Sequence, residues 1–275
     1  MPVWLGIDFS GDHNMWSPGC NRSNVWIATL ENHQSPLKYS IVDLQPVQKL
    51  PGTGSPFSRL VTKLHAGNFR AAGIDAPFSL PKSVQQNNHG TLLRLIGQID
   101  CHGRPFPRAQ DFLAEFKGVD LPWGRHEYRE TESHWRKKGM NVRSTLWGGP
   151  RGGAPMTSAC LTLLNQAGCS VWPFSTALDE PLLVEAFPAA QLKTWGLPHQ
   201  KYNGSTPEAV LNREKILKEL DARVEFGNYR NKMAGNADAL DAVLAAFAAI
   251  AVTENQLPED ISGISAVEGW IAVHR

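Results

Sequence analysis

The sequence predicts an α/β fold in which helices flank a mixed β-sheet. Three strand-like segments separated by turn-rich links open the chain, and a helix and a fourth strand follow them. A helix between two strands is typical of a crossover connection, which makes the sheet mixed. A long alanine-rich helix near the end of the chain is apolar enough to pack on this sheet. The strands are expected at 3–9, 24–30, 37–47 and 71–75, and the crossover helix at 56–65.

The rest of the chain consists of one unpatterned segment followed by regular elements. Residues 82–153 lack clear periodicity and contain clusters of basic and aromatic residues, so we predict an insertion or lid within a single domain spanning 1–275. Thr206 and Pro207 are typical of a helix cap and first helical position. The remaining elements are expected as helices at 156–166, 206–223 and 236–252, a strand at 182–187, and a last strand or turn at 264–273 behind the final helix.

Composition limits the class of protein. Hydrophobic residues make up 42% of the 275 residues, enough for a large core, and the formal charge of +1 indicates that any site for a polyanion is local. The longest apolar run, 242–252, is shorter than the about 20 residues that span a bilayer, and no secretion signal precedes the first strand. The four cysteines show no C-x-x-C spacing, so we expect free thiols in a cytoplasmic protein.

Two strands end in the same tripeptide, Gly-Ile-Asp. Side chains alternate between the faces of a strand, so Asp8 shares a face with Gly6, and Asp75 shares one with Gly73. Glycine within a strand is typical of close approach by another element. The alanines of the helix at 236–252 leave its backbone thinly covered, so this helix is predicted to pack tightly over the two glycines.

The same helix brings two more acids to the sheet. Asp238 and Asp241 are three residues apart and share one side of the helix, facing inward. Buried carboxylates repel one another unless a cation lies between them, and Mg²⁺ or Mn²⁺ prefers such oxygen ligands. Taken singly, Asp238 could be present only because the helix dipole favours a negative charge in the first turn, and Asp8 or Asp75 could form a turn at a strand end. Together, the four acids predict a metal site with two ions.

These segments form an ordered set of motifs along nearly the whole chain. They are Gly6-Ile7-Asp8, Gly73-Ile74-Asp75-Ala76-Pro77, Val184-Glu185-Ala186-Phe187-Pro188, Asp238-Ala239-Leu240-Asp241-Ala242 and Glu268-Gly269-Trp270-Ile271. The set resembles domain-of-unknown-function family 429, whose members are interpreted as RNase H-like nucleases. The resemblance implies a ribonuclease H-like fold with a five-stranded mixed sheet, in which the first and fourth strands are neighbours and the C-terminal helix crosses over them. The D-x-x-D opening of that helix also resembles the Holliday-junction resolvases.

The sequence points less sharply to the residues that contact the substrate. Basic and aromatic residues alternate between 104 and 151, where they could bind phosphates and bases, but acids among them are equally typical of a solvated surface. From this segment we predict Arg143 as a substrate-binding residue. Lys201 and Arg213 flank the second half of the sheet and are predicted to reach a phosphate.

We therefore expect a metal-dependent nuclease that hydrolyses phosphodiester bonds in nucleic acid. Asp8 is expected to bridge two ions, Asp75 and Asp241 to complete one coordination sphere each, and Asp238 or Glu185 to tune the second ion. Glu268 is expected behind the last helix, away from the site.

Two alternatives stay open, and the sequence indicates no oligomeric state. One is a non-catalytic module that binds nucleic acid or nucleotides. The other is an actin-like phosphotransferase or ATPase, with Asp8-Phe9-Ser10-Gly11 as a phosphate-holding turn, although no second such turn is visible. A serine hydrolase is disfavoured because the chain contains no G-x-S-x-G motif.

Overall fold

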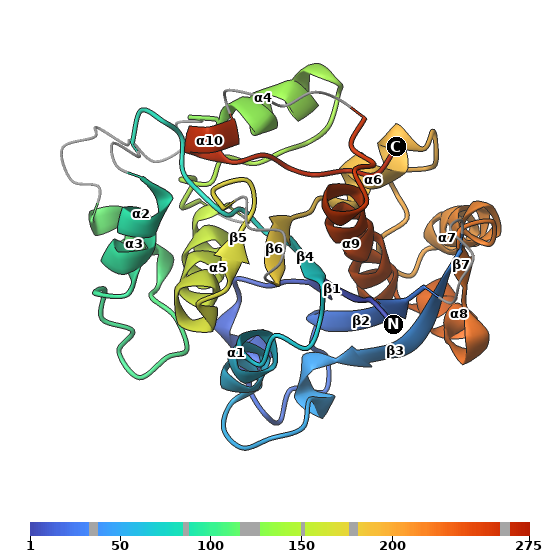
Figure 1. Cartoon of the computed structure of the whole chain (residues 1–275), viewed down its shortest axis with the longest axis horizontal. Helices are drawn as coiled ribbons and strands as arrows, with labels where there is room; N and C mark the ends of the chain where they lie inside the picture. Colours follow the sequence, from blue (N-terminus) through green and yellow to red (C-terminus); the bar gives the residue numbers. More distant parts are fainter. Residues whose placement is uncertain (33–37, 85–87, 116–126, 150–151, 176–180, 259–264) are drawn as a thin grey trace.

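A computed structural model of the chain describes residues 1–32, 38–84, 88–115, 127–149, 152–175, 181–258 and 265–275 (Figure 1). These residues form an α/β structure around one mixed sheet of seven strands, in the order β5-β6-β4-β1-β2-β3-β7. The strands are β1 (Val3–Asp8), β2 (Trp26–Glu31), β3 (Tyr39–Pro46), β4 (Ala71–Asp75), β5 (Ser170–Val171), β6 (Leu182–Glu185) and β7 (Val224–Glu225).

Ten α-helices and three short 3₁₀ helices accompany the sheet in the described part of the chain. The 3₁₀ helices are His13–Trp16, Val47–Lys49 and Gly227–Tyr229. The α-helices are α1 (Pro56–His65), α2 (His89–Ile96), α3 (Ala109–Ala114), α4 (Glu130–Lys137), α5 (Ala154–Ala167), α6 (Pro188–Thr194), α7 (Pro207–Leu220), α8 (Arg230–Gly235), α9 (Ala237–Thr253) and α10 (Ser265–Glu268).

The predicted mixed sheet is confirmed, whereas its predicted number of five strands is not. β1, β2 and β3 pair antiparallel, and β1 pairs parallel with β4 after the crossover helix α1, so the first and fourth strands are neighbours as expected. β6 adds a further parallel strand beside β4. The two additional strands, β5 and β7, lie at the sheet edges and have two residues each, which is too short to leave a periodic pattern in the sequence.

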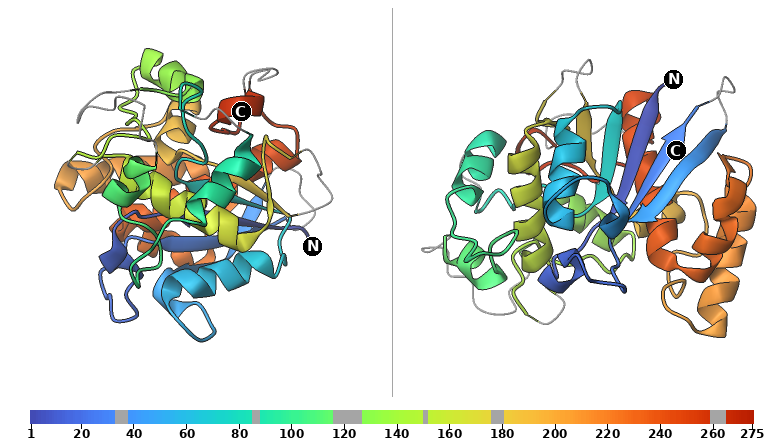
Figure 2. Two further views of the ribbon diagram at one scale, coloured as in Figure 1. Left: turned by 90° about the vertical axis from the view of Figure 1, so that its left-hand side faces the viewer. Right: turned by 90° about the horizontal axis from the view of Figure 1, so that it is seen from below.

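Helices cover both faces of the sheet (Figures 1 and 2). On one face, Leu5 and Ile7 pack with buried side chains of α1 and α5. On the other face, Trp4 and Ala71 pack with α9, which α6 and α8 contact in turn. The strand residues therefore alternate between two apolar layers, and the position of α9 decides which strand residues it covers.

The unpatterned segment 82–153 contains three helices that the sequence did not predict. α2 and α3 pack against α5, and α4 lies beside α10 (Figure 1). These helices have six to eight residues, so each offers too few turns for a clear periodic signal. The prediction that this segment is an insertion or lid stays a prediction, and 85–87, 116–126 and 150–151 lie outside the described residues.

Two further expectations concern sulfur and membranes. Cys20, Cys101, Cys160 and Cys169 are free thiols, as predicted. Among the residues that the structure describes, no helix combines the length and the apolar character needed to cross a membrane.

Candidate carboxylate site

Asp8 and Asp75 lie side by side at the ends of two parallel strands. The register of β1 and β4 pairs Asp8 with Asp75 and, two residues earlier, Gly6 with Gly73. Because side chains alternate along a strand, all four positions are on the same face of the sheet. Two carboxyl groups therefore lie next to a patch without side chains, as the repeated tripeptide predicts.

Helix α9 fills this patch with its backbone. A Cβ atom added to Gly6 would overlap the carbonyl oxygen of Ala242, and one added to Gly73 would overlap that of Ala245. The predicted tight packing is therefore confirmed, and it depends on glycine in the sheet and alanine in the helix. This close contact brings the first turns of α9 to the strand ends that bear the two aspartates.

The start of α9 adds Asp241 and Asp238 to the site. The Asn236 side chain caps the helix by accepting a hydrogen bond from the Ala239 backbone amide at 3.2 Å. One turn into the helix, Asp241 is 7% exposed and accepts a hydrogen bond from the Tyr202 hydroxyl at 2.9 Å. Asp238 is half-buried. Tyr202 thus orients one carboxyl, and no pattern in the sequence predicts this contact.

The four acids affect one another electrostatically. The pKa of Asp8 is raised well above its usual value, first by burial and then by repulsion from Asp241, Asp75 and Asp238. The pKa of Asp241 is raised well above its usual value by burial and by Asp75, against the opposing effect of the Tyr202 hydrogen bond. Burial and Glu185 raise the pKa of Asp75 to about 7, and burial raises the pKa of Asp238. The charged forms of these acids are therefore unfavourable without a cation.

The oxygen atoms of the four acids are suitable ligands for a hard divalent cation, but their present positions do not form a metal site. Four carboxyl groups supply only oxygen, the ligand type that Mg²⁺ and Mn²⁺ prefer. However, no three His, Cys, Asp or Glu side chains of the described residues form a group that could hold a metal ion as they stand. A metal site here would therefore require the carboxylates to turn toward the ion when it binds.

Glu185 lies close to Asp75 but is held in an ion pair. In the sheet, Glu185 is paired with Ile74, and its carboxylate accepts hydrogen bonds from Arg129 Nη1 at 2.7 Å and Nη2 at 2.5 Å. Arg129 is 1% exposed and also donates from Nε to Glu132 at 3.0 Å. Both oxygens of Glu185 are thus engaged by Arg129, and the prediction that Glu185 tunes a second ion stays a prediction.

Glu268 differs from its predicted position. Its carboxylate accepts hydrogen bonds from the backbone amides of Lys82 and, at 2.7 Å, Glu130, and its carbonyl oxygen accepts from the Ser79 hydroxyl. It therefore joins α10 to the start of α4, next to Arg129, rather than lying behind the last helix. The region predicted as a last strand or turn, 264–273, contains α10, followed by described residues in no regular element, and residue 264 lies outside the described residues. The Ala272 amide donates a backbone hydrogen bond to the Glu185 carbonyl at the end of β6.

A cavity of about 260 Å³ opens beside Asp75. Glu185, Arg129 and Arg143 also line it, so the structure brings the predicted substrate residue Arg143 into the same cavity as two of the predicted acids. A second cavity, of about 440 Å³, is lined by Asp238 together with Arg22, Lys49 and Trp26, none of which the sequence singled out. Two cavities with cationic lining residues therefore border the four acids, one at Asp75 and one at Asp238.

Two of the predicted phosphate contacts have other partners. Arg213 is 1% exposed and donates hydrogen bonds to the backbone carbonyls of Ala234 at 2.7 Å and Gly204 at 2.8 Å. These bonds hold α7 against the loop before it and the end of α8, so Arg213 has a structural role and does not face a substrate. Lys201 is exposed and forms an ion pair with Glu208 at 3.2 Å on the surface.

Comparison with known proteins identifies the family of the chain but no individual relative. A family model described as "Protein of unknown function (DUF429)" matches residues 26–261. No curated protein and no solved structure matches the chain. The match covers α9 and the strands β2 to β7, whereas β1 with Asp8 precedes it.

Proposed function

The chain belongs to the DUF429 family, and from that premise we propose that it is a metal-dependent nuclease with a ribonuclease H-like fold. The observation that supports this proposal best is the in-register pair Asp8 and Asp75, with Asp241 brought to it by the tight packing of α9. Neighbouring first and fourth strands, crossed by the last long helix, are what the resemblance to RNase H-like nucleases implies.

In this proposal Asp8, Asp75 and Asp241 hold one or two Mg²⁺ or Mn²⁺ ions, with Asp238 as a further ligand. When bound, such ions supply Lewis-acid activation and charge neutralisation for displacement at phosphorus. Because their pKa values are raised, the carboxyls release protons when they bind the ion. Tyr202 orients Asp241 through its hydrogen bond.

Other residues supply the surroundings of the substrate. Arg143 lines the cavity beside Asp75, where a guanidinium is suited to bind a phosphate. Arg22 and Lys49 line the cavity beside Asp238 and would bind the phosphates of a chain that continues past the carboxylates. This arrangement of cations favours a polynucleotide over a small phosphate ester.

One observation favours a second candidate function. Since no ready metal-binding group exists among the described residues, the chain could be a nucleic-acid or nucleotide-binding module without catalysis. The actin-like alternative loses support, because Gly11, in its supposed phosphate-holding turn, lies against the backbone of Pro155 and Met156. A Cβ added to Gly11 would overlap this backbone, so the start of α5 occupies that side of the turn.

Cleavage assays separate the two remaining functions. We expect the purified protein to cut single-stranded or branched DNA or RNA with Mg²⁺ or Mn²⁺ and far less with Ca²⁺, whose coordination is looser. Asp8→Asn and Asp241→Asn should each reduce the rate by orders of magnitude, and the double variant should be hardly worse than either, since ligands of one centre act as a unit.

The matched control is Asp221→Asn, which removes an exposed carboxylate at the end of α7. It should cleave at the wild-type rate. Glu268→Gln is unsuitable as a control because Glu268 takes part in the network around Arg129. A substrate panel without metal-dependent cleavage would leave the binding module as the better function. Wild-type activity in the double variant would exclude the proposed site.

A further inference from the structure

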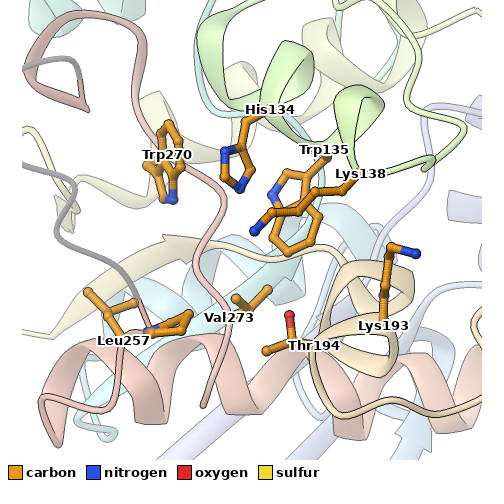
Figure 3. Close-up of a pocket in the computed structure, with 9 residues that line it drawn as sticks. His134, Trp135, Lys138, Lys193, Thr194, Leu257, Trp270 and Val273 are labelled. Atoms are coloured by element: carbon orange, nitrogen blue, oxygen red, sulfur yellow. The ribbon is translucent and has the colours of Figure 1, made fainter.

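A third cavity, of about 290 Å³, lies between α4, α6 and the two segments that follow α9 and α10 (Figure 3). Its size is near the lower limit of about 300 Å³ for small-molecule sites. It is separate from the carboxylates: Asp241 is in the first turns of α9, whereas Leu257, which lines the cavity, follows the other end of this helix of 17 residues, which is about 25 Å long. The lining residues used below are His134, Trp135, Lys138, Lys193 and Trp270.

Trp135 presents a hydrogen-bond donor that has no acceptor. Its side chain is 3% exposed, and its indole Nε1 is buried without a hydrogen-bond partner among the described residues. In Figure 3 this nitrogen is on the side of the indole that faces His134 and Trp270 across the cavity. Buried N–H groups are rarely left unpaired, so an acceptor atom of a ligand would satisfy it.

The charge of the lining favours an anion. Lys138 directly follows α4, with its Nζ 5.0 Å from the centre of the Trp135 ring. Lys193 lines the cavity from α6, with its nitrogen directed away from the other labelled side chains in Figure 3, so Lys138 supplies the positive charge nearest the rings. No aspartate or glutamate is among the described residues that line the cavity. A ligand that accepts hydrogen bonds and carries negative charge is therefore complementary to it.

The remaining lining favours a planar ring. Trp270 and His134 have ring centres 5.2 Å apart, and His134 contacts Trp135 edge-on at 5.3 Å. Aromatic faces of this kind stack on bases, while lysines bind phosphate. We propose that this cavity is a binding site for a nucleoside monophosphate, distinct from the carboxylate site and independent of the metal chemistry proposed there.

The test is isothermal titration calorimetry of the full chain with adenosine 5′-monophosphate in the presence of a chelator. We expect saturable binding, at least about tenfold weaker binding of uncharged adenosine, and weaker binding of inorganic phosphate, because neither supplies both ring and charge. Lys138→Gln and Trp135→Phe should each weaken the binding of the nucleotide by about fivefold or more. The first variant removes a positive charge, and the second removes the N–H donor.

Lys137→Gln is the matched control, since this exposed lysine is adjacent in α4 but does not line the cavity. It should bind as the wild type does. Should Trp135→Phe fail to fold, the surface variant Lys138→Gln still decides the outcome. Absence of nucleotide binding, equal binding of adenosine, or unchanged affinity in Lys138→Gln would each overturn the proposal. Asp8→Asn should bind normally, which separates this result from any failure of the nuclease assignment.

Discussion

The raised pKa of the single residue Asp75 makes the free energy of unfolding depend on pH. Its pKa of about 7 exceeds the value of about 3.9 in an unfolded chain, so between about pH 4 and 7 the folded state binds a proton that the unfolded state does not. The unfolded state then binds fewer protons, and the free energy of unfolding falls as pH rises through this window. The raised pKa values of Asp8 and Asp241 act in the same direction.

We therefore predict that Asp75→Asn removes part of this pH dependence. Without metal, the variant should gain stability relative to the wild type as pH rises from 5 to 7.5, because it cannot lose the proton. Thermal unfolding in chelator at constant ionic strength measures the difference. Burial lowers the pKa of His89 to about 4, so His89 makes the free energy of unfolding depend on pH in the opposite direction. This contribution is the same in the variant and in the wild type, and it cancels when the two are compared. A difference in melting temperature that does not change with pH would contradict the assigned environment of Asp75.

Arg129 is the cation that neutralises two buried carboxylates next to the site. It pairs with Glu185 and Glu132 inside the protein, where all three side chains are almost fully buried. Arg129→Met leaves two buried carboxylates without their cation, so we expect a loss of about 3–5 kcal/mol in the free energy of unfolding. Urea unfolding measures this loss. The control Arg94→Met removes an exposed arginine that donates to Thr91, and it should change little; equal effects would contradict the buried network.

The sequence revealed some of these residues and not others, for physical reasons. Asp8 and Asp75 could be predicted because each ends a strand and shares its face with a glycine, which is local information. The pairing of Arg129 with Glu185 joins residues 56 positions apart, and Arg129 precedes a short helix in an unpatterned segment. The buried role of Arg213 was equally hidden, since its backbone acceptors depend on the path of a loop.

At the scale of elements, the long or sharply bounded segments were predictable. Helix α1 has the predicted bounds, since Ser55 caps it and Pro56 begins it, and α9 was recognised by its alanines and its cap Asn236. The bare face of β1 and β4 even indicated where α9 would pack. Helices α2 to α4 and the edge strands were not predictable, because they are too short for periodicity to distinguish them from loops.

The close packing of α9 on β4 predicts that one methyl group added at Gly73 destabilises the fold. Gly73→Ala would force its Cβ into the carbonyl oxygen of Ala245, and neither backbone can move without separating helix and sheet. We expect a loss of about 3 kcal/mol or more in the free energy of unfolding, measured by urea unfolding. Gly19→Ala is the control, because its added Cβ would meet no atom within 4 Å. A Gly73→Ala protein of normal stability would contradict the close contact.

At the scale of the whole molecule, three distant segments meet at one repulsive cluster. β1, β4 and α9 are fixed by apolar packing on both faces of the sheet, and this packing holds the four acids near one another even though their charges repel. A divalent cation would relieve that repulsion in the folded state only, since the unfolded chain separates the three segments. The fold itself is therefore linked to metal binding.

We accordingly predict that Mg²⁺ or Mn²⁺ raises the melting temperature of the wild-type protein. At 100 times the dissociation constant the gain is about 2.7 kcal/mol, or about 5–10 °C for a chain of this size. Asp8→Asn should be neutral or stabilising in chelator, because it removes one repelling charge, and it should lose the response to metal. Differential scanning fluorimetry with chelator and with millimolar metal provides both measurements.

Two comparisons make this prediction decisive for the site. Asp221→Asn should retain the full metal response, since its carboxylate is exposed at the end of α7 and lies outside the cluster, and a response lost there would indicate that the ion binds at Asp221 instead. Raising the pH from 6 to 8 should enlarge the response of the wild type, because fewer protons must then leave Asp75, whose pKa is about 7, when the ion binds. Equal melting curves with chelator and with manganese would show that the carboxyls do not turn to form a metal site, and a strongly unfolded Asp8→Asn would assign Asp8 to the structure of the fold instead.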